Sequence, residues 1–147
     1  MLVSQWLAST PGQRVAVLTL APRHTDAAVL ARDLVATIRS VAPQVDPRLA
    51  SLAATDQATL GHPLVDALSE GLAAAAHDSV LVLEDAHVLS HHPVIGDLGH
   101  LFTALPPSAR GIVAMRNDPP WSLHQLRLDD RLVEIRGADL AFAEADA

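Results

Sequence analysis

The sequence predicts one α/β domain with a largely parallel sheet. Two observations lead to this fold class: short apolar runs of strand length recur along the chain, and segments with apolar residues at helical spacing lie between them. A third observation sets the size, because 147 residues, half of them hydrophobic, suffice for one compact core. Aromatic residues make up only 3%, so Leu, Val and Ala must fill that core.

The first part of the chain alternates helix, strand and helix. Residues 1–9 carry apolar side chains at helical spacing, and the Thr-Pro-Gly that follows ends the pattern. Residues 14–20 form an apolar run rich in β-branched side chains, which predicts a buried parallel strand that ends before the next proline. Thr25 is the expected N-cap of an amphipathic helix that continues to Val41, after which another proline closes the segment.

Two further helices are predicted in the middle of the chain. An Asp-Pro pair at 46–47 supplies a cap and an N1 proline for a short helix through about Ala54, and polar residues 55–59 then form a loop. Pro63 is also suited to the N1 position, and the leucines after it recur every four residues to about His77. These segments therefore supply helices to cover the sheet.

The second half of the chain repeats the alternation. Residues 80–83 are four consecutive apolar residues, too few for a helix, and predict a strand that is buried on both faces. A helix starts at Pro93 and ends at the next Pro-Pro pair, and residues 111–115 form another short apolar strand. We expect a short helix over 121–128 and a final strand over 131–135. The order favours a three-layer sandwich with a mostly parallel sheet.

Composition excludes several classes of function. All ten basic residues are arginines, and without lysine the chain contains neither a Schiff-base amine nor the lysine of a P-loop. Without cysteine it has no disulfide, no thiol nucleophile and no cysteine-ligated zinc. A net charge of -7 argues against direct contact with nucleic acid. The absence of an 18-residue apolar stretch and of a signal-peptide pattern predicts no membrane span and a cytoplasmic protein.

Polar residues that follow two of the predicted strands form the candidate site. Ligands of open α/β sheets bind beyond the carboxyl ends of the strands. Glu84 and Asp85 follow the 80–83 strand directly, where one carboxylate can hold Mg²⁺ and the other can orient a water. Arg116 follows the 111–115 strand, and its guanidinium could reach a phosphate at the same edge. A carboxylate pair with an arginine is typical of a nucleotide site.

Each of these features also has an ordinary structural interpretation. Acids at strand ends are often solvated loop residues, and a phosphorelay receiver, which gathers acids in the same place, requires a lysine that this chain lacks. We interpret His87, His91 and His92 as solvated loop histidines, because their spacing does not match a metal site. Trp6 and Trp121 are expected to be packing residues.

The stretch from residue 80 to residue 142 resembles the ATPase module of large LuxR-type transcriptional regulators of the MalT-like kind, members of the STAND class of P-loop NTPases. In that family an apolar strand ends in two acids and an aromatic-His pair, a proline then starts a helix, and the next strand ends in Ser-Arg or Thr-Arg before Asp-Pro-Pro. The matching positions here are Glu84, Asp85, Ala86-His87, Pro93, Arg116 and Asp118-Pro119-Pro120.

The resemblance implies roles for the site residues in the intact family. Glu84 and Asp85 would coordinate Mg²⁺, Asp85 would orient the attacking water, and Arg116 would sense the γ-phosphate of ATP. Residues 1–137 would form a partial NTPase domain, and residues 138–147 would begin a linker to a helical domain. The family's Walker A motif runs directly into a helix that resembles LVSQW, so the resemblance implies a chain that begins where that motif ends, whether through a true truncation or a misplaced start codon.

The chain also departs from the family pattern. The Walker A loop, its lysine and its strand are absent, Glu84 replaces an aspartate, and Met115 replaces a small hydroxyl residue. The family's P-loop strand would lie between the strand that ends in Arg116 and the one over 131–135, so its loss would leave open sheet edges. We expect no appreciable ATP binding by the chain alone and self-association through those edges. The alternative is a non-enzymatic α/β module that docks a partner there.

Overall fold

The computed structural model describes residues 2–9, 11–53 and 59–141, in which the helices and strands follow the predicted order up to α5. The strands are β1 (Arg14–Thr19), β2 (Ser79–Glu84) and β3 (Ala109–Val113). The α-helices are α1 (Leu2–Ser9), α2 (Ala27–Arg39), α3 (His62–Ala73), α4 (Val94–Thr103) and α5 (His124–Leu128). Short 3₁₀-helices are η1 (Pro22–Thr25), η2 (Pro47–Leu52) and η3 (Ala86–Leu89).

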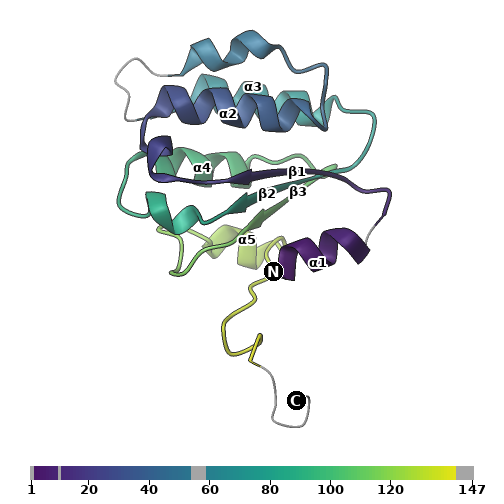
Figure 1. Cartoon of the computed structure of the whole chain (residues 1–147), viewed down its shortest axis with the longest axis vertical. Helices are drawn as coiled ribbons and strands as arrows, with labels where there is room; N and C mark the ends of the chain where they lie inside the picture. The colour runs from purple at the N-terminus through teal and green to yellow at the C-terminus, as the bar shows by residue number, and fades with distance from the viewer. Residues whose placement is uncertain (1, 10, 54–58, 142–147) are drawn as a thin grey trace.

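The described strands form one open parallel sheet in the order β1-β2-β3 (Figure 1). Thr19 is in register with Glu84, and Leu83 is in register with Val113, so all three strands end at the same edge. The α/β class and the parallel pairing are confirmed. β2 is the central strand, and it is buried on both faces because helices lie on both sides of the sheet (Figure 1).

The main core lies between the sheet and helices α2, α3 and α4, which cover one side of it (Figure 1). Ala16 and Leu18 of β1 and Leu81 and Leu83 of β2 point into this core, where leucines of the helices are fully buried. Burial of a leucine side chain stabilises the fold by roughly 1.5–3 kcal/mol. A core of aliphatic residues, as the composition requires, therefore holds the sheet.

The opposite side of the sheet is less completely covered. Helices α1 and α5 lie on this side in Figure 1. Val82, in the central strand, is fully buried there, whereas its register partner Val17 on the edge strand is 40% exposed. The structure is therefore compatible with an α/β sandwich whose second helical layer is thin.

Several predicted boundaries shift along the chain. The N-cap of α2 is Asp26 and not Thr25, because the Asp26 carboxylate accepts the N–H groups of Ala28 and Val29. α3 ends at Ala73, earlier than predicted, and β3 starts and ends two residues before the predicted 111–115 strand. Of the predicted loop 55–59, only Thr59 lies within the described residues.

The predicted helix over 121–128 begins only at His124, because Trp121 is a packing residue. Its indole N–H donates to the backbone oxygen of Ile95 at 2.6 Å, and its ring stacks on Phe102 with centroids 5.8 Å apart. A Cβ at Gly111 would lie 2.2 Å from that Phe102 ring. The close approach of α4 to β3 thus requires glycine at this position.

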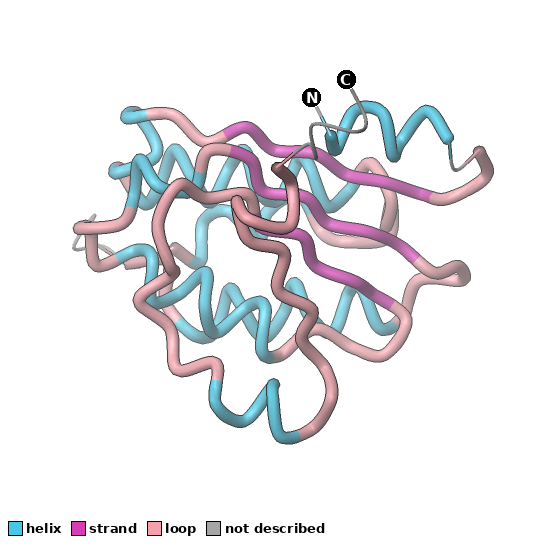
Figure 2. Tube along the Cα trace, turned by 90° about the horizontal axis from the view of Figure 1, so that it is seen from below, coloured by secondary structure: helices cyan, strands magenta, loops and turns pink. Residues whose placement is uncertain are grey.

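The predicted final strand over 131–135 is wrong. This segment lies outside the sheet, and its alternating apolar residues Val133 and Ile135 are 85% and 62% exposed. Figure 2 shows the three strands side by side, with the segment after α5 running as a loop. Apolar alternation produces a strand only where a neighbouring strand can pair with it, and no described strand pairs with the outer edge of β3.

A buried carboxylate connects α4 to the start of the segment that leads into α3. Asp97 is 9% exposed and accepts the backbone N–H of the fully buried Leu60 at 2.7 Å. This hydrogen bond satisfies two polar groups that would otherwise be unpaired in the core.

None of the helices among the described residues is long and apolar enough to cross a bilayer.

Candidate functional site

The ends of the three strands are held together by backbone hydrogen bonds that continue past the strands. The N–H of Leu20 donates to the Glu84 oxygen at 2.9 Å, and the N–H of Ala114 donates to the Leu83 oxygen at 2.9 Å. The N–H of Ala86 then donates to the Ala114 oxygen at 3.1 Å. The predicted pair Glu84-Asp85 therefore lies in the centre of the carboxyl edge, between the ends of β1 and β3.

Glu84 has a partner that sequence reasoning missed. The Thr19 hydroxyl donates to Glu84 Oε2 at 3.1 Å, across the register pair that ends β1 and β2. This hydrogen bond restricts the rotamers of a half-buried carboxylate whose other lone pairs stay available to a ligand. The signal in the sequence was a polar residue at position 19 within an otherwise apolar strand.

Asp85 adopts a left-handed backbone conformation, with φ of 57° and ψ of 32°. Aspartate tolerates this region better than most residues, but it still costs roughly 1 kcal/mol. The turn is maintained by the Ala86 hydrogen bond to β3's extension and by the start of η3. Such backbone strain is common at ligand sites, and the exposed Asp85 carboxylate is accessible from solvent.

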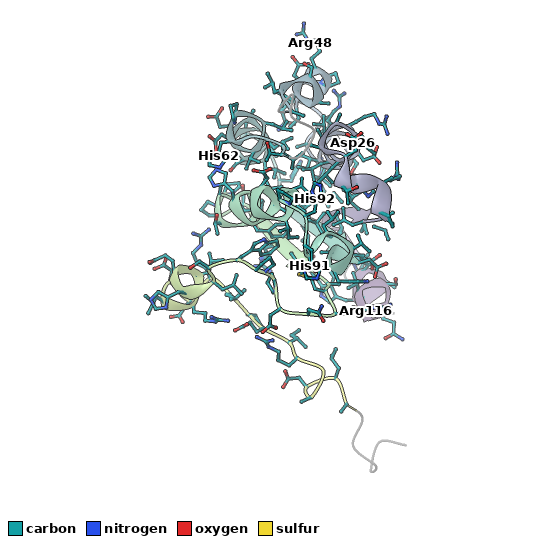
Figure 3. The ribbon with its side chains drawn as sticks, turned by 90° about the vertical axis from the view of Figure 1, so that its left-hand side faces the viewer. Asp26, Arg48, His62, His91, His92 and Arg116 are labelled. Carbon is teal, nitrogen blue, oxygen red and sulfur yellow. The ribbon has the colours of Figure 1, made fainter. Side chains whose placement is uncertain are left out.

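Arg116 lies two residues beyond Ala114, on the same side of the molecule as the strand ends (Figure 3). Its side chain is exposed and has no hydrogen-bond or ion-pair partner among the described residues. Met115, which precedes it, is half-buried and packs against the core. The edge thus carries two carboxylates and one arginine that is available to an anionic ligand.

A buried histidine supports this edge from the β1 side. His24, in η1, is fully buried; its Nδ1 accepts the Ala21 N–H at 2.9 Å, and its Nε2 lies 3.1 Å from Asp33 Oδ2. Burial raises the pKa of Asp33, but hydrogen bonds from His24 and Arg32 and the charges of Arg23 and Arg32 outweigh it and lower that pKa. The backbone bond requires His24 to be unprotonated at Nδ1, so the ring donates from Nε2.

The three histidines after the acid pair differ from one another. His91 is exposed, as predicted, whereas His87 and His92 are half-buried and are therefore not the solvated residues we predicted. His92 Nδ1 accepts the Val94 N–H at 3.3 Å, and His87 Nδ1 is buried without a hydrogen-bond partner among the described residues. Figure 3 shows His91 and His92 on the side of the molecule that carries Arg116.

The chemistry of the carboxyl edge suits a hard cation more than a soft one. Carboxylate and hydroxyl oxygens are ligands for Mg²⁺, which keeps several waters and relies on substrate phosphates. No three His, Asp or Glu side chains of the described residues are arranged to hold a metal ion as they stand. Glu84 and Asp85 can therefore contribute two ligands, and the remaining ones must come from water or from a bound phosphate.

A shallow, open depression of about 660 Å³ lies at the opposite edge of the sheet. Its lining comes from the residues at and just before the starts of the three strands, including Arg14, His77 and Ser108. The predicted site residues are thus not part of this depression.

No protein-family model matches this chain, and no curated protein matches it at a significant level. The family interpretation therefore depends on the motif between residues 80 and 142 and on the LVSQW segment at residues 2–6.

Proposed function

We propose that this chain is part of the nucleotide-binding module of a MalT-like, LuxR-type regulator of the STAND class, the part that follows the phosphate-binding loop. In the intact cytoplasmic protein Glu84 and Asp85 would hold Mg²⁺, Asp85 would orient water, and Arg116 would contact the γ-phosphate of ATP. ATP and Mg²⁺ are the cofactors of that intact protein. The chain by itself would not bind ATP appreciably.

The observation that carries the proposal is the arrangement at the carboxyl edge. Parallel strands in register bring Glu84 beside Thr19, and the β3 extension delivers Arg116 to the same side of the molecule. Phosphoryl transfer depends mainly on positioning and charge stabilisation, for which a metal-binding carboxylate and an arginine are recurrent parts. The left-handed Asp85 adds a strained aspartate at the same place.

A second observation concerns the outer edge of β3, with which no described strand pairs. The segment after α5 contacts the chain on both sides of β3. Arg131 donates to the backbone oxygen of Leu105 at 3.4 Å, and Arg136 forms an ion pair with Asp118. Leu105 precedes β3 and Asp118 follows it, so the segment runs in the same general direction as β3. The resemblance expects a P-loop strand between these two elements.

The weak ATP binding that we expect of the isolated chain follows from its composition. Backbone N–H groups of a glycine-rich loop and one lysine supply most of the grip on a triphosphate. The 147 residues contain no lysine, and two carboxylates attract Mg²⁺ weakly when no phosphate helps to bind it. A net charge of -7 also repels free ATP.

Isothermal titration with Mg-ATP tests the proposal on the chain as it exists. We expect no saturable heat, and a micromolar site would contradict the proposal. The chain extended before Leu2 with a β-strand and a G-x-x-x-x-G-K-[ST] loop should gain saturable binding, because the extension supplies the missing phosphate contacts. Failure of a folded extended chain to bind would also count against the family interpretation.

The second candidate is a non-enzymatic interaction module. The unpaired edge of β3 and the exposed side chains of Val133 and Ile135 favour it, because open edges and exposed apolar residues are docking surfaces. Size-exclusion chromatography with light scattering distinguishes the two candidates. A discrete dimer or heterocomplex that is lost in Val133→Asp supports the interaction module, whereas heterogeneous aggregates support the incomplete nucleotide module.

A further inference from the structure

The segment that follows α5 neither pairs with the sheet nor packs into the main core. Its side chains Val133 and Ile135 are 85% and 62% exposed, and residues 131–136 belong to no strand of the described structure. Figure 2 shows this stretch as a continuous loop. Burial of apolar surface therefore contributes little to its position, which depends instead on polar contacts.

Glu134, in this segment, is held by two arginines. Arg127 of α5 forms a bidentate pair with it, since Arg127 Nε donates to Glu134 Oε2 at 3.0 Å and Arg127 Nη2 donates to Oε1 at 2.9 Å. Arg136 Nη2 donates to the same Oε1 at 2.7 Å. The hydrogen bonds from Arg127 lower the pKa of Glu134, so this carboxylate is charged at neutral pH. The bidentate pair thus joins the segment to α5.

Arg136 connects this pair to a distant part of the chain. Its Nη1 donates to Oδ1 of Asp118, which lies 18 positions earlier, in the loop after β3. Its backbone also begins the next turn, because its N–H donates to Asp139 Oδ2 at 2.7 Å and its carbonyl oxygen accepts the Asp139 N–H at 2.9 Å. Arg136 therefore contacts the segment, the turn that follows it and the loop after β3.

The loop that Arg136 contacts is the one that carries Arg116. The N–H of Ala114 anchors the start of this loop to β2, and the indole of Trp121 anchors its end to α4. Between these anchors, the hydrogen bonds and ion pairs within the described part of the chain are those of Asp118 with Arg136. This ion pair is therefore the polar tether in the middle of the loop.

These four side chains form a charge network on the surface of the protein. Isolated exposed ion pairs contribute little, but a bidentate contact within a network is a more favourable case. Two guanidinium groups and two carboxylates are linked in one chain of contacts. Their exposed fractions lie between 32% and 73%, so dissolved salt screens them. The screening length falls from about 8 Å at physiological ionic strength to about 3 Å at 1 M.

We propose that an ionic clasp couples the segment after α5 to the loop that carries Arg116. The clasp consists of Arg127, Glu134, Arg136 and Asp118. Movement of the segment opens the clasp and releases Asp118, and movement of the loop releases the segment in the same way. No nucleotide contact is part of the clasp, so it is independent of the proposed function. If Arg116 does contact a γ-phosphate, the clasp lets the chain after α5 change the position of that arginine.

Backbone ¹⁵N relaxation of the full chain at low salt tests the clasp. We expect order parameters of about 0.85 for residues 117–118 and 135–136, and values below about 0.6 at both places in Arg136→Gln. Arg110→Gln is the matched control, because Arg110 is an exposed arginine on β3 that has no ion-pair partner among the described residues. This control should leave the order parameters unchanged. Far-UV circular dichroism checks that each variant is folded.

Salt and a second variant test the coupling itself. In the unmodified chain, 1 M NaCl should reproduce the effect of Arg136→Gln, which is an estimate from the screening length of about 3 Å. Asp118→Asn removes the contact from the loop side, so it should raise the mobility of residues 135–136, with no further effect in the Arg136→Gln background.

Equal order parameters in the unmodified chain and Arg136→Gln would overturn the proposal. So would a segment that becomes mobile while the amide resonances and order parameters of residues 117–118 stay the same, because the segment and the loop would then move independently. Titration with Mg-ATP is a separate experiment, so failure of the clasp and failure of the proposed function can be distinguished.

Discussion

Replacement of the buried carboxylate on α4 should destabilise the fold far more than the same replacement on the surface. Asp97 is 9% exposed and accepts the Leu60 N–H at 2.7 Å. A hydrogen bond to a charged group contributes about 1.5–3 kcal/mol, and a buried amide left unpaired costs about 1–3 kcal/mol. Asp97→Ala should therefore lower the free energy of unfolding by about 2 kcal/mol. Asp97→Asn should recover part of the loss, since its amide oxygen can still accept from Leu60.

Urea denaturation followed by far-UV circular dichroism measures this difference. With a slope of roughly 2 kcal/mol per M, Asp97→Ala should lower the midpoint by about 1 M at unchanged slope. Asp129→Ala is the control, because Asp129 accepts a side-chain hydrogen bond from Gln125 at 3.0 Å but is exposed at the C-cap of α5. Its loss should be below about 0.5 kcal/mol. Equal midpoints for Asp97→Ala and the unmodified chain would refute the reasoning.

Three further predictions concern packing, pH and association. Gly111→Ala should lower the melting temperature, because the new Cβ would lie 2.2 Å from the Phe102 ring and overpacking costs about 1–3 kcal/mol. Gly96→Ala should not lower it, because the space around that Cβ is open. The pKa of Asp33 is lowered in the folded chain, so its contribution to stability is present above the unfolded value near 3.8 and is lost as pH falls below it. The urea midpoint should therefore depend less on pH in Asp33→Asn than in the unmodified chain. Identical pH profiles for the two proteins would contradict this. Val133→Asp should leave the urea midpoint unchanged, because this side chain is 85% exposed, and a clear loss of stability would show that the segment packs in solution.

The elements that local pattern determines were predictable from sequence. β2 contains four consecutive apolar residues followed by acids, and no other element fits so short a run, so its burial on both faces and the position of Glu84 at its end followed directly. α2 and α4 were predicted from their apolar spacing, which matches the residues buried against the sheet. The parallel order of strands could be inferred because helices separate them.

The features that could not be predicted from sequence depend on contacts between residues that are distant in the chain. The alternation over 131–135 predicted a strand, but a strand forms only where a partner edge is paired with it, and local residues do not encode that. Thr19 and His24 have their roles through Glu84 and Asp33, and the first pair is separated by 65 positions. The buried histidine was missed because a lone histidine in a loop carries no periodic signal.

We propose that the carboxyl edge of this sheet is the metal and γ-phosphate side of an ATP site. The most direct test is Mg-ATP affinity, by isothermal calorimetry, of the chain extended at its N-terminus with a strand and P-loop, compared with its Glu84→Gln and Arg116→Ala variants. We expect saturable binding to the extended chain, weakened at least about tenfold in both variants and unchanged in Glu70→Gln, which replaces an exposed acid on α3. Equal affinities across all four proteins would contradict it.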